Sequence, residues 1–326
     1  MYAIHVDDEH KLSWAPTELD APAPSEVQIQ VHAAGVNRAD LAQRAGRYPP
    51  PPGASPILGL EVSGVIVACG DQVRSHTVGD RVSALLAGGG YAERVNVDAR
   101  HVITIPDSVS FATAAGWMET FATAWLNLGD LAGLASRTPR ARVVLHAAGS
   151  GVGTAGLQLC RAWGHHTLAI AGSDAKLSRC ATLGATHLCN RHTQRWTDVL
   201  RDTLGEADVI LDPVGASTVP DGLRALATDG TLVLIGLLGG RRAEVDLGRL
   251  LIKRARIQGS TLRARSADFK ARLVATLASQ VLPRIVDQSL TVPIDATFPI
   301  KDADAAHRLL ASNETFGKLV LKVTDA

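Results

Sequence analysis

Residues 141–161 read ARVVLHAAGSGVGTAGLQLCR, and this stretch decides the fold. It opens with Arg142–Ala147, a short apolar run that is typical of a buried strand. A glycine-rich segment follows, and Thr154–Trp163 then carries apolar residues at helical spacing. A strand, a glycine-rich turn and a helix in this order form the unit that binds the pyrophosphate of a dinucleotide.

The glycines of this turn allow a sharp change of direction and let the backbone approach phosphates without an intervening Cβ. The helix that follows offers N–H groups and the positive end of its dipole to an anion. The run Gly151-x-Gly153-x-x-Gly156 fits the pattern GxGxxG, which also occurs in tight strand–helix turns without a ligand. Because the correct elements flank the turn on both sides, we favour a cofactor site. Its predicted contacts are Gly149, Ser150, Gly151 and Val152.

Length and composition limit the classes of protein that fit. The chain has 326 residues, enough for two domains of roughly 100–200 residues each. Hydrophobic residues make up 46% and charged residues 20%, as in ordinary globular proteins. The net charge of +1 provides no strong field toward nucleic acid or an anionic membrane, so neither partner is expected.

Targeting signals are not apparent in the sequence. No apolar run reaches the roughly 18–20 residues of a membrane span, and the first residues lack the basic and apolar regions of a signal peptide. The four cysteines are scattered without a CxxC pair, which indicates buried thiols in a reducing compartment. We therefore expect a cytoplasmic protein.

Two kinds of pattern divide the chain. Residues 1–117 are predicted to be β-rich, and residues 118–265 alternate helices with apolar strands, as in a parallel sheet covered on both faces. Residues 266–326 are expected to return to the first domain. The predicted strands are 27–31, 59–67, 81–86, 91–97, 101–105, 143–146, 167–171, 209–211, 232–236, 291–300 and 319–323, the predicted helices are 118–128, 156–163, 176–183 and 268–281, and Pro49–Pro52 is predicted to be a loop.

Several spaced motifs agree with one family. They are GVNRADL at 35–41, GLEVSGV at 59–65, GDRV at 79–82, AAGSGVG at 147–153 and GKLVL at 317–321. Over essentially its whole length the chain resembles the medium-chain dehydrogenase/reductase superfamily, in its zinc-independent quinone oxidoreductase (zeta-crystallin-like) branch. Residues 37–61 look closest to the stress-inducible quinone oxidoreductase subgroup. The resemblance implies an α/β protein with a GroES-like β-rich catalytic domain and a Rossmann doubly wound parallel sheet.

The resemblance also bears on metal binding. Zinc-dependent members carry a cysteine where this chain has Asn37 and a histidine where it has Leu60, and neither residue suits zinc. The four-cysteine structural zinc lobe is replaced by a short loop near Leu86–Tyr91. The eleven histidines also form no cluster with ligand spacing. No metal site is expected.

The end of the second predicted strand of the alternating region bears on the choice of cofactor. NAD-binding folds place an acidic residue about 20 positions after the glycines, but here the strand ends in the neutral Gly172 and Ser173. Asp174 lies past the strand end, where it suits a helix N-terminus. The run Gly172-Ser173-x-x-Lys176 is similar to the family's NADPH pattern. Arg191 replaces a tyrosine of related proteins, and it either strengthens phosphate binding or is a solvated charge. We expect NADPH, bound by Gly172, Ser173, Lys176 and Arg191.

Hydride transfer requires placement of the reactants and polar groups for the charge that develops on the acceptor. The resemblance assigns the catalytic roles to Tyr48 and Asn37, and places Asn37 beside the cofactor as well. For Tyr48 the alternative is a half-buried ring whose hydroxyl is bonded to backbone, and Glu61 is interpreted as structural. Further cofactor contacts implied by the resemblance are Thr123, Gly236, Leu237, Leu238, Thr261, Leu262, Asn313 and Lys318, of which Asn313 and Lys318 could equally be surface residues.

These observations predict an NADPH-dependent reductase that acts on quinones or related conjugated carbonyls without zinc, as a homodimer. One alternative is an alkenal or enoyl-thioester reductase of the same fold. A second is an NADPH-binding structural or nucleic-acid-binding protein of crystallin type, against which the absence of a basic stripe argues.

Overall fold

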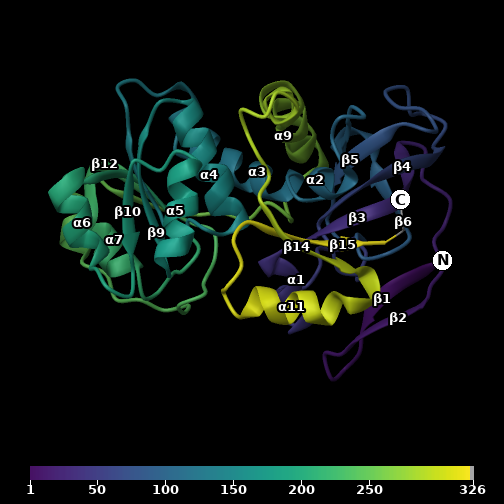
Figure 1. Cartoon of the computed structure of the whole chain (residues 1–326), viewed down its shortest axis with the longest axis horizontal. Coiled ribbons are helices and arrows are strands. Elements are labelled where there is room, and N and C mark those ends of the chain that lie inside the picture. The colour runs from purple at the N-terminus through teal and green to yellow at the C-terminus, as the bar shows by residue number, and fades with distance from the viewer. Residues whose placement is uncertain (324–326) are drawn as a thin grey trace. The chain divides into compact units, whose positions relative to one another are not determined.

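The computed structural model describes residues 1–323, and the chain forms two compact units (Figure 1). Unit 1 comprises Met1–Ala122 and Leu262–Ala326, and unit 2 comprises Thr123–Thr261. The boundaries suggested by sequence patterns, 117/118 and 265/266, lie within five residues of these. None of the helices within residues 1–323 is long and apolar enough to cross a membrane.

Unit 2 is built on a six-stranded sheet in which every paired strand is parallel to its neighbour. Its order is β10-β9-β8-β11-β12-β13, so the direction of winding reverses between β8 and β11. The strands are β8 (Arg142–Leu145), β9 (His166–Ala171), β10 (His187–Asn190), β11 (Ala207–Asp212), β12 (Leu226–Leu234) and β13 (Arg256–Gly259). This is the predicted doubly wound Rossmann sheet.

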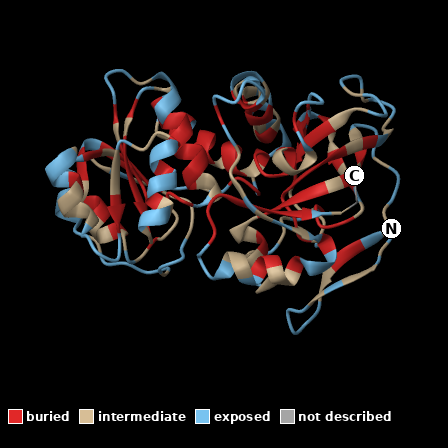
Figure 2. Ribbon diagram, in the orientation of Figure 1, coloured by how far each residue is buried: buried red, intermediate tan, exposed pale blue. Residues whose placement is uncertain are grey.

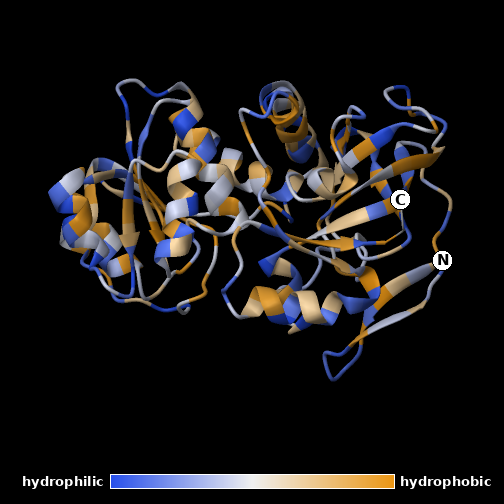
Figure 3. Ribbon diagram, in the orientation of Figure 1, coloured by the Kyte–Doolittle hydropathy of each residue, from blue (hydrophilic) through white to orange (hydrophobic). Residues whose placement is uncertain are grey.

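Helices cover both faces of this sheet. In Figure 1, α4 (Gly151–Ala162) and α5 (Asp174–Thr182) lie on one side, and α6 (Trp196–Thr203) and α7 (Val219–Ala225) lie on the other. The short helix α8 (Leu247–Ile252) precedes β13. The central strands β9, β8, β11 and β12 are largely apolar and buried between these layers, whereas the edge strand β13 is mostly exposed (Figures 2 and 3). Burial on both faces explains why the strands have nearly continuous apolar runs.

Unit 1 contains a seven-stranded sheet with the path β14-β15-β3-β4-β5-β7, in which β6 also pairs with β3. The strands are β3 (Glu26–Val36), β4 (Glu61–Cys69), β5 (Arg81–Leu85), β6 (Arg94–Asp98), β7 (Val102–Thr104), β14 (Ile294–Pro299) and β15 (Lys318–Lys322). The C-terminal strand β15 runs antiparallel to β3, which confirms that the end of the chain returns to the first domain. Pro49–Pro52 lie in a loop, as predicted.

Several elements of unit 1 differ from the sequence expectations. The hairpin of β1 (Tyr2–Val6) and β2 (Leu12–Pro16) and the helices α1 (Arg38–Arg44) and α11 (Ala303–Ala311) were not predicted. Their sequences are short or mixed in polarity, so tertiary packing determines them. The short helices α2 (Phe111–Ala115) and α10 (Leu282–Val286) were not predicted either, and the remaining helices are α3 (Met118–Ala124) and α9 (Ala267–Gln280). The prediction of a single α-helix at 118–128 was wrong at its C-terminal end. There α3 continues into a π-helical segment, Trp125–Leu131, which belongs to unit 2.

The core of unit 1 is the contact of β3 with β4. Val27, Ile29 and Val31 of β3 are fully buried, and β3 pairs with three other strands. The backbone of β4 approaches β3 so closely at Gly64 that a Cβ there would lie 2.0 Å from the carbonyl oxygen of Gln30. Only glycine fits at this crossing.

We predict that Gly64→Ala destabilises the protein by about 1–3 kcal/mol or more, because the new methyl group must push β3 and β4 apart. The unfolding midpoint in urea would report this change. The matched control is Gly259→Ala in β13, where a Cβ would have no neighbour within 4 Å. Equal stability of the two variants would contradict the prediction.

Candidate functional site

The turn between β8 and α4 in unit 2 has the geometry of an anion cradle. Ser150 caps α4, and its Oγ accepts a hydrogen bond from the Gly153 N–H at 3.1 Å. A Cβ at Gly153 would lie 2.5 Å from the carbonyl oxygen of Ala147, so glycine is required there. The turn is tied to the end of β9, because the Ala148 N–H donates to the Ile170 carbonyl at 2.9 Å.

The residues predicted to contact the cofactor here, Gly149–Val152, therefore lie together in this turn, with Gly151 and Val152 in the first turn of α4. First-turn N–H groups have no acceptor within their own helix, and they suit a phosphate. The last glycine of the pattern has a packing role. A Cβ at Gly156 would lie 3.0 Å from Leu128 Cδ1 and 3.5 Å from Leu145 Cδ2, so its absence brings α4 close to β8.

The ends of β9 and β10 bring four predicted residues to one place. Gly172 follows β9, and Ser173 caps α5, its Oγ accepting from the Lys176 N–H at 3.3 Å. The Arg191 N–H donates to the Ala171 carbonyl at 3.0 Å. A Cβ at Gly172 would lie 2.9 Å from Arg191 Nη2, so the guanidinium lies directly over this glycine. The end of β9 is thus neutral and bordered by cations.

The acidic residue nearest this place is directed elsewhere. Asp174 Oδ1 accepts a hydrogen bond of 2.7 Å from Asn190 Nδ2 at the end of β10. Asn190 is buried, which keeps this pair in place. The Asp174 carboxylate therefore completes the contact between α5 and β10, consistent with the helix-terminal role that its position suggests.

The remaining predicted residues of unit 2 belong to three separate segments of the chain. Gly236, Leu237 and Leu238 follow β12, and the Leu238 N–H donates to the Pro213 carbonyl after β11 at 3.2 Å. Leu237 and Leu238 are half exposed. Thr261 follows β13, and the Thr123 carbonyl accepts from Asn127 Nδ2 at 2.7 Å. Gly236–Leu238 therefore lie at the carboxyl edge of the sheet, on the same edge as the glycine turn.

In unit 1 the predicted residues Asn37 and Lys318 meet in a buried polar network. The Lys318 ammonium lies 2.7 Å from Glu61 Oε1, 2.7 Å from Asn37 Oδ1 and 2.8 Å from the Val36 carbonyl. Asn37 Nδ2 donates to Glu61 Oε1 at 3.0 Å, and the Glu119 N–H donates to Glu61 Oε2 at 3.0 Å. Both Lys318 and Glu61 are buried. Lys318 is therefore not the surface residue that the sequence allowed, since its three donors all bind protein oxygens.

A second buried chain continues from this network. Asp40 in α1 accepts from the Asn37 N–H at 2.7 Å, the Gly59 N–H at 3.1 Å and the Tyr91 hydroxyl at 3.1 Å. The Tyr91 oxygen lies 3.2 Å from His307 Nε2 in α11. Burial raises the pKa of Asp40 to about 6, and burial together with the nearby Arg44 lowers the pKa of His307 to about 4.

Tyr48, the other predicted catalytic residue, packs against an arginine. The Arg263 guanidinium lies 5.4 Å from the centre of the Tyr48 ring, and its Nη1 donates to the Tyr48 carbonyl at 3.3 Å. Arg263 is 4% exposed, and its Nη2 has no hydrogen-bond partner among the described residues. Burial raises the pKa of the Tyr48 phenol, with a further rise from Glu119 that Arg263 opposes. The phenol therefore stays protonated and able to donate.

The last two predicted residues have simpler surroundings. Leu262, which precedes Arg263, is buried. Asn313 is exposed, adopts a left-handed backbone after α11 and accepts a hydrogen bond from Arg38 Nη2. It is thus a surface residue that joins α1 to the end of α11.

Two family models match the chain. Residues 23–107 match the alcohol dehydrogenase GroES-like domain, and residues 151–279 match the zinc-binding dehydrogenase family. The chain belongs to the medium-chain dehydrogenase/reductase superfamily. The predicted superfamily and fold class are thereby confirmed.

Relatives of known sequence fall into two groups. A mycocerosic acid synthase-like polyketide synthase of Mycobacterium tuberculosis is 31% identical over 324 residues, which are 98% of this chain but 15% of that protein. The synaptic vesicle membrane protein VAT-1 homologue of Rattus norvegicus is 29% identical over 96% of this chain and 81% of the relative. The chain therefore spans only a small part of the first of these proteins and most of the second.

Solved structures of similar chains cover it almost completely. Escherichia coli quinone oxidoreductase complexed with NADPH has a TM-score of 0.88 at 26% identity, over 99% of this chain and 100% of that one. An NAD-dependent alcohol dehydrogenase has a TM-score of 0.85 at 28% identity, with the same coverage. The CurK enoyl reductase has a TM-score of 0.85 at 26% identity, over 99% of each chain.

The donor set of unit 1 does not fit the zinc named in one family description. Leu60 is apolar and buried, and it offers no donor. The Lys318 ammonium lies 2.7 Å from both Asn37 Oδ1 and Glu61 Oε1, so these oxygens are already paired with a cation of the protein. Zinc sites in proteins use cysteine, histidine and carboxylate ligands, and no group of three such residues suited to a metal occurs among residues 1–323.

Sequence reasoning did not single out Arg263 as a site residue, and it interpreted Glu61 as structural without identifying its partner Lys318. Glu61 stands in a glycine-rich strand motif, and its partner Lys318 is 257 positions later, so no local pattern could pair them. Arg263 belongs to a loop that was singled out for other residues, and an isolated arginine usually indicates a solvated surface. Its burial and unpaired Nη2 became visible only in the structure.

We predict that His307→Gln changes the acid sensitivity of the fold. An unfolded histidine takes up a proton below its ordinary pKa of 6.5, whereas folded His307 resists protonation down to about pH 4, so its contribution to stability is lost as pH falls through this window. Relative to the parent, the variant should gain about 2 kcal/mol between about pH 7 and about pH 4.5. Urea unfolding at the two pH values measures this difference.

The contribution of Asp40 to stability depends on pH in the opposite direction. Its pKa is raised in the folded protein, so this contribution is lost as the pH rises from about 4 through about 6. The parent curve therefore contains two opposed slopes, and only the difference between variant and parent isolates His307. His10→Gln, in the exposed turn between β1 and β2, is the control. A pH-independent difference between His307→Gln and the parent would refute the assignment.

Proposed function

We propose that the protein is an NADPH-dependent reductase that transfers hydride to quinones or related conjugated carbonyls without zinc. The proposal depends above all on the end of β9, where a neutral strand end is bordered by Ser173, Lys176 and Arg191. The similarity to a quinone oxidoreductase complexed with NADPH supports the same conclusion.

The cofactor would be held by the glycine turn and the β9 end of unit 2. The first-turn N–H groups of α4 suit the pyrophosphate, and the Arg191 guanidinium with the Ser173 hydroxyl suits the 2′-phosphate of NADPH. Lys176, half-buried in the first turn of α5, adds a second cation. The Asp174 carboxylate keeps its charge, but the hydrogen bond from Asn190 ties it to the end of β10.

The acceptor would be served by unit 1. When bound, the nicotinamide supplies the hydride. The Tyr48 phenol stays protonated and can donate a hydrogen bond to the acceptor oxygen as negative charge develops there. A proton then comes from Tyr48 or from water. Asn37 is a positioning residue in this proposal. Its carboxamide is already bonded to Lys318 and Glu61, so it holds the surrounding loop in place.

An enoyl-thioester reductase is the second candidate, favoured by the similarity to the CurK enoyl reductase and to a segment of a polyketide synthase. NADPH consumption measured against quinones, alkenals and enoyl thioesters separates the candidates. Turnover of quinones supports the first, and turnover of alkenals or thioesters alone supports the second. NADPH binding without any turnover would point to a structural, crystallin-type role.

Two further parts of the proposal concern the cellular compartment and the oligomeric state of the enzyme. The four cysteines are free, and three of them are buried, which suits a reducing compartment such as the cytoplasm. A homodimer is proposed from the family resemblance alone, and sedimentation of the purified protein would test it.

We predict that the protein binds NADPH more tightly than NADH, and that Arg191→Ala and Lys176→Ala each weaken NADPH roughly tenfold or more while leaving NADH nearly unchanged. The reason is that each substitution removes a cation next to the proposed 2′-phosphate site. Fluorescence titration with the two cofactors measures the effect. Arg195→Ala, whose guanidinium lies 3.9 Å from Asp221, is the control. Equal affinity of the parent for both cofactors would overturn the claim.

We predict that Tyr48→Phe lowers quinone turnover by about 10²-fold, near the low end for a lost donor, because water partly replaces the phenol. NADPH affinity should stay near that of the parent, which separates an effect on the acceptor from an effect on the cofactor. Tyr2→Phe, in the exposed part of β1, is the control. Unchanged turnover in Tyr48→Phe would remove the phenol from the mechanism.

A further inference from the structure

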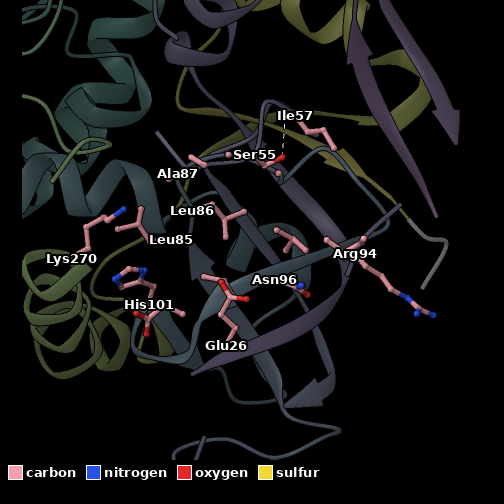
Figure 4. Close-up of a pocket in the computed structure, with 18 of the residues that line it drawn as sticks. Glu26, Ser55, Ile57, Leu85, Leu86, Ala87, Arg94, Asn96, His101 and Lys270 are labelled. Atoms are coloured by element: carbon pink, nitrogen blue, oxygen red, sulfur yellow. Dashed lines mark hydrogen bonds between the residues drawn. The ribbon is translucent and has the colours of Figure 1, made fainter. Parts of the chain in front are cut away.

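Unit 1 contains a pocket of about 390 Å³ that none of the predicted site residues lines (Figure 4). Loop residues 53–57, the segment Leu85–Gly89, strand β6 and helix α9 form its walls. Much of the lining is apolar, including Ile57, Leu85, Leu86, Val95 and Val97. A volume of this size suits a small organic molecule with a flat apolar body.

One cation faces this pocket without a direct partner. Lys270 of α9 is 8% exposed, and none of the hydrogen bonds or ion pairs of residues 1–323 involves its ammonium. In Figure 4 the side chain extends from α9 toward Leu85, on the pocket wall. Burial lowers the pKa of Lys270, and Glu119 and Asp98 partly oppose this effect. An ammonium on a largely buried side chain, without a protein partner, gains from pairing with an anionic ligand.

Of the other charged side chains of the pocket, Glu18 is exposed, and Asp98, Glu26, Arg94 and His101 are bonded to protein groups. Asp98 accepts three hydrogen bonds from the Arg100 guanidinium, the shortest of them 2.7 Å. Glu26 Oε2 accepts from the Ala23 N–H at 3.0 Å, and Arg94 Nε donates to Gln30 at 3.0 Å. The ring of His101 is bonded to the Ala267 carbonyl at 2.9 Å, and burial lowers its pKa, so it stays neutral.

The pocket adjoins the residues proposed to act on the acceptor. Ala87 lines it, and the Ala87 carbonyl accepts a hydrogen bond of 2.7 Å from Arg263 Nε. The same guanidinium packs on the Tyr48 ring and keeps its Nη2 unpaired. Arg263 and Lys270 are also close enough to affect each other electrostatically. Lys270 therefore lines the pocket, and Arg263, which packs on Tyr48, is bonded to Ala87 of the pocket wall.

We propose that this pocket, with Lys270 at its wall and Arg263 at its border with Tyr48, binds the carboxylate or sulfonate group of an aromatic acceptor. That the ligand is a hydride acceptor rests on the proposed reductase function. Binding of an anionic aromatic ligand in the pocket does not depend on turnover. The Lys270 ammonium pairs with the anionic group, the apolar walls hold the ring, and Arg263 Nη2 supplies a second donor. The protein would thus prefer anionic acceptors over neutral ones of the same shape.

The test compares two ligands that accept no hydride, 2-naphthoate and 2-naphthamide, by calorimetry on the full chain without cofactor. We expect 2-naphthoate to bind about tenfold or more tightly than the amide, because a charged hydrogen bond is lost in the amide. Lys270→Met should bring the two affinities together, and Lys270→Arg should restore the preference. Lys301→Met, which removes an exposed lysine outside the pocket, should keep it.

A kinetic comparison links the pocket to the reaction. The ratio of kcat/KM for 1,4-naphthoquinone-2-sulfonate to that for 1,4-naphthoquinone should fall about tenfold in Lys270→Met. Equal binding of 2-naphthoate and 2-naphthamide by the parent, or a preference that survives in folded Lys270→Met, overturns the proposal. If no quinone is reduced but 2-naphthoate binds through Lys270, the anion pocket stands and the proposed reductase function fails.

Discussion

The buried ion pair of Lys318 and Glu61 is the interaction on which the organisation of unit 1 depends. It joins β15 to β4, and through Asn37 it also anchors the start of α1. Removing two charges from water is costly, and the cost is offset only when the remaining donors and acceptors are bonded. Here the ammonium has three oxygen partners, and both carboxylate oxygens accept hydrogen bonds.

This network leaves little freedom around it. A Cβ at Gly35 would lie 2.3 Å from the Ala115 carbonyl and 2.5 Å from Glu61 Oε1, so the backbone of β3 must approach the carboxylate without a side chain. Asn37 is held at both ends of its carboxamide, and Asp40 is held by three donors. The pair therefore acts as a rigid support, and the groups free to meet a ligand are elsewhere, at Tyr48, Arg263 and Lys270.

The proposed ligand-binding groups of the two units differ in how far they are buried. In unit 2 the groups proposed to bind phosphate are backbone N–H groups and half-buried or exposed cations at the ends of parallel strands, where solvent reaches them before a ligand arrives. In unit 1 the unpaired donors, Arg263 Nη2 and the Lys270 ammonium, belong to buried side chains, where an unpaired state is costly. Such groups discriminate more strongly between ligands, because a ligand that fails to pair with them leaves that cost in place.

The sequence by itself determined the local units. Apolar runs and glycines between them indicated the strand, turn and helix at 142–162, the alternation that forms the parallel sheet, and the residues gathered at the ends of β8 and β9, because these depend on neighbours within about 30 positions. Spaced motifs indicated the family. Helices α1 and α11 were not visible, because their short and mixed sequences depend on partners far away in the chain.

Only the tertiary structure decided which polar residues are occupied and which are available. Lys318 appeared from its position to be either a cofactor contact or a surface charge, yet it is buried against Glu61, 257 residues away. Arg263 and Lys270 carried no signal, since burial of a single cation depends on the strands and loops packed around it. The pairing of side chains distant in sequence is a property of the packed fold, because a hydrogen bond requires its atoms to be about 3 Å apart, and no local pattern specifies that distance.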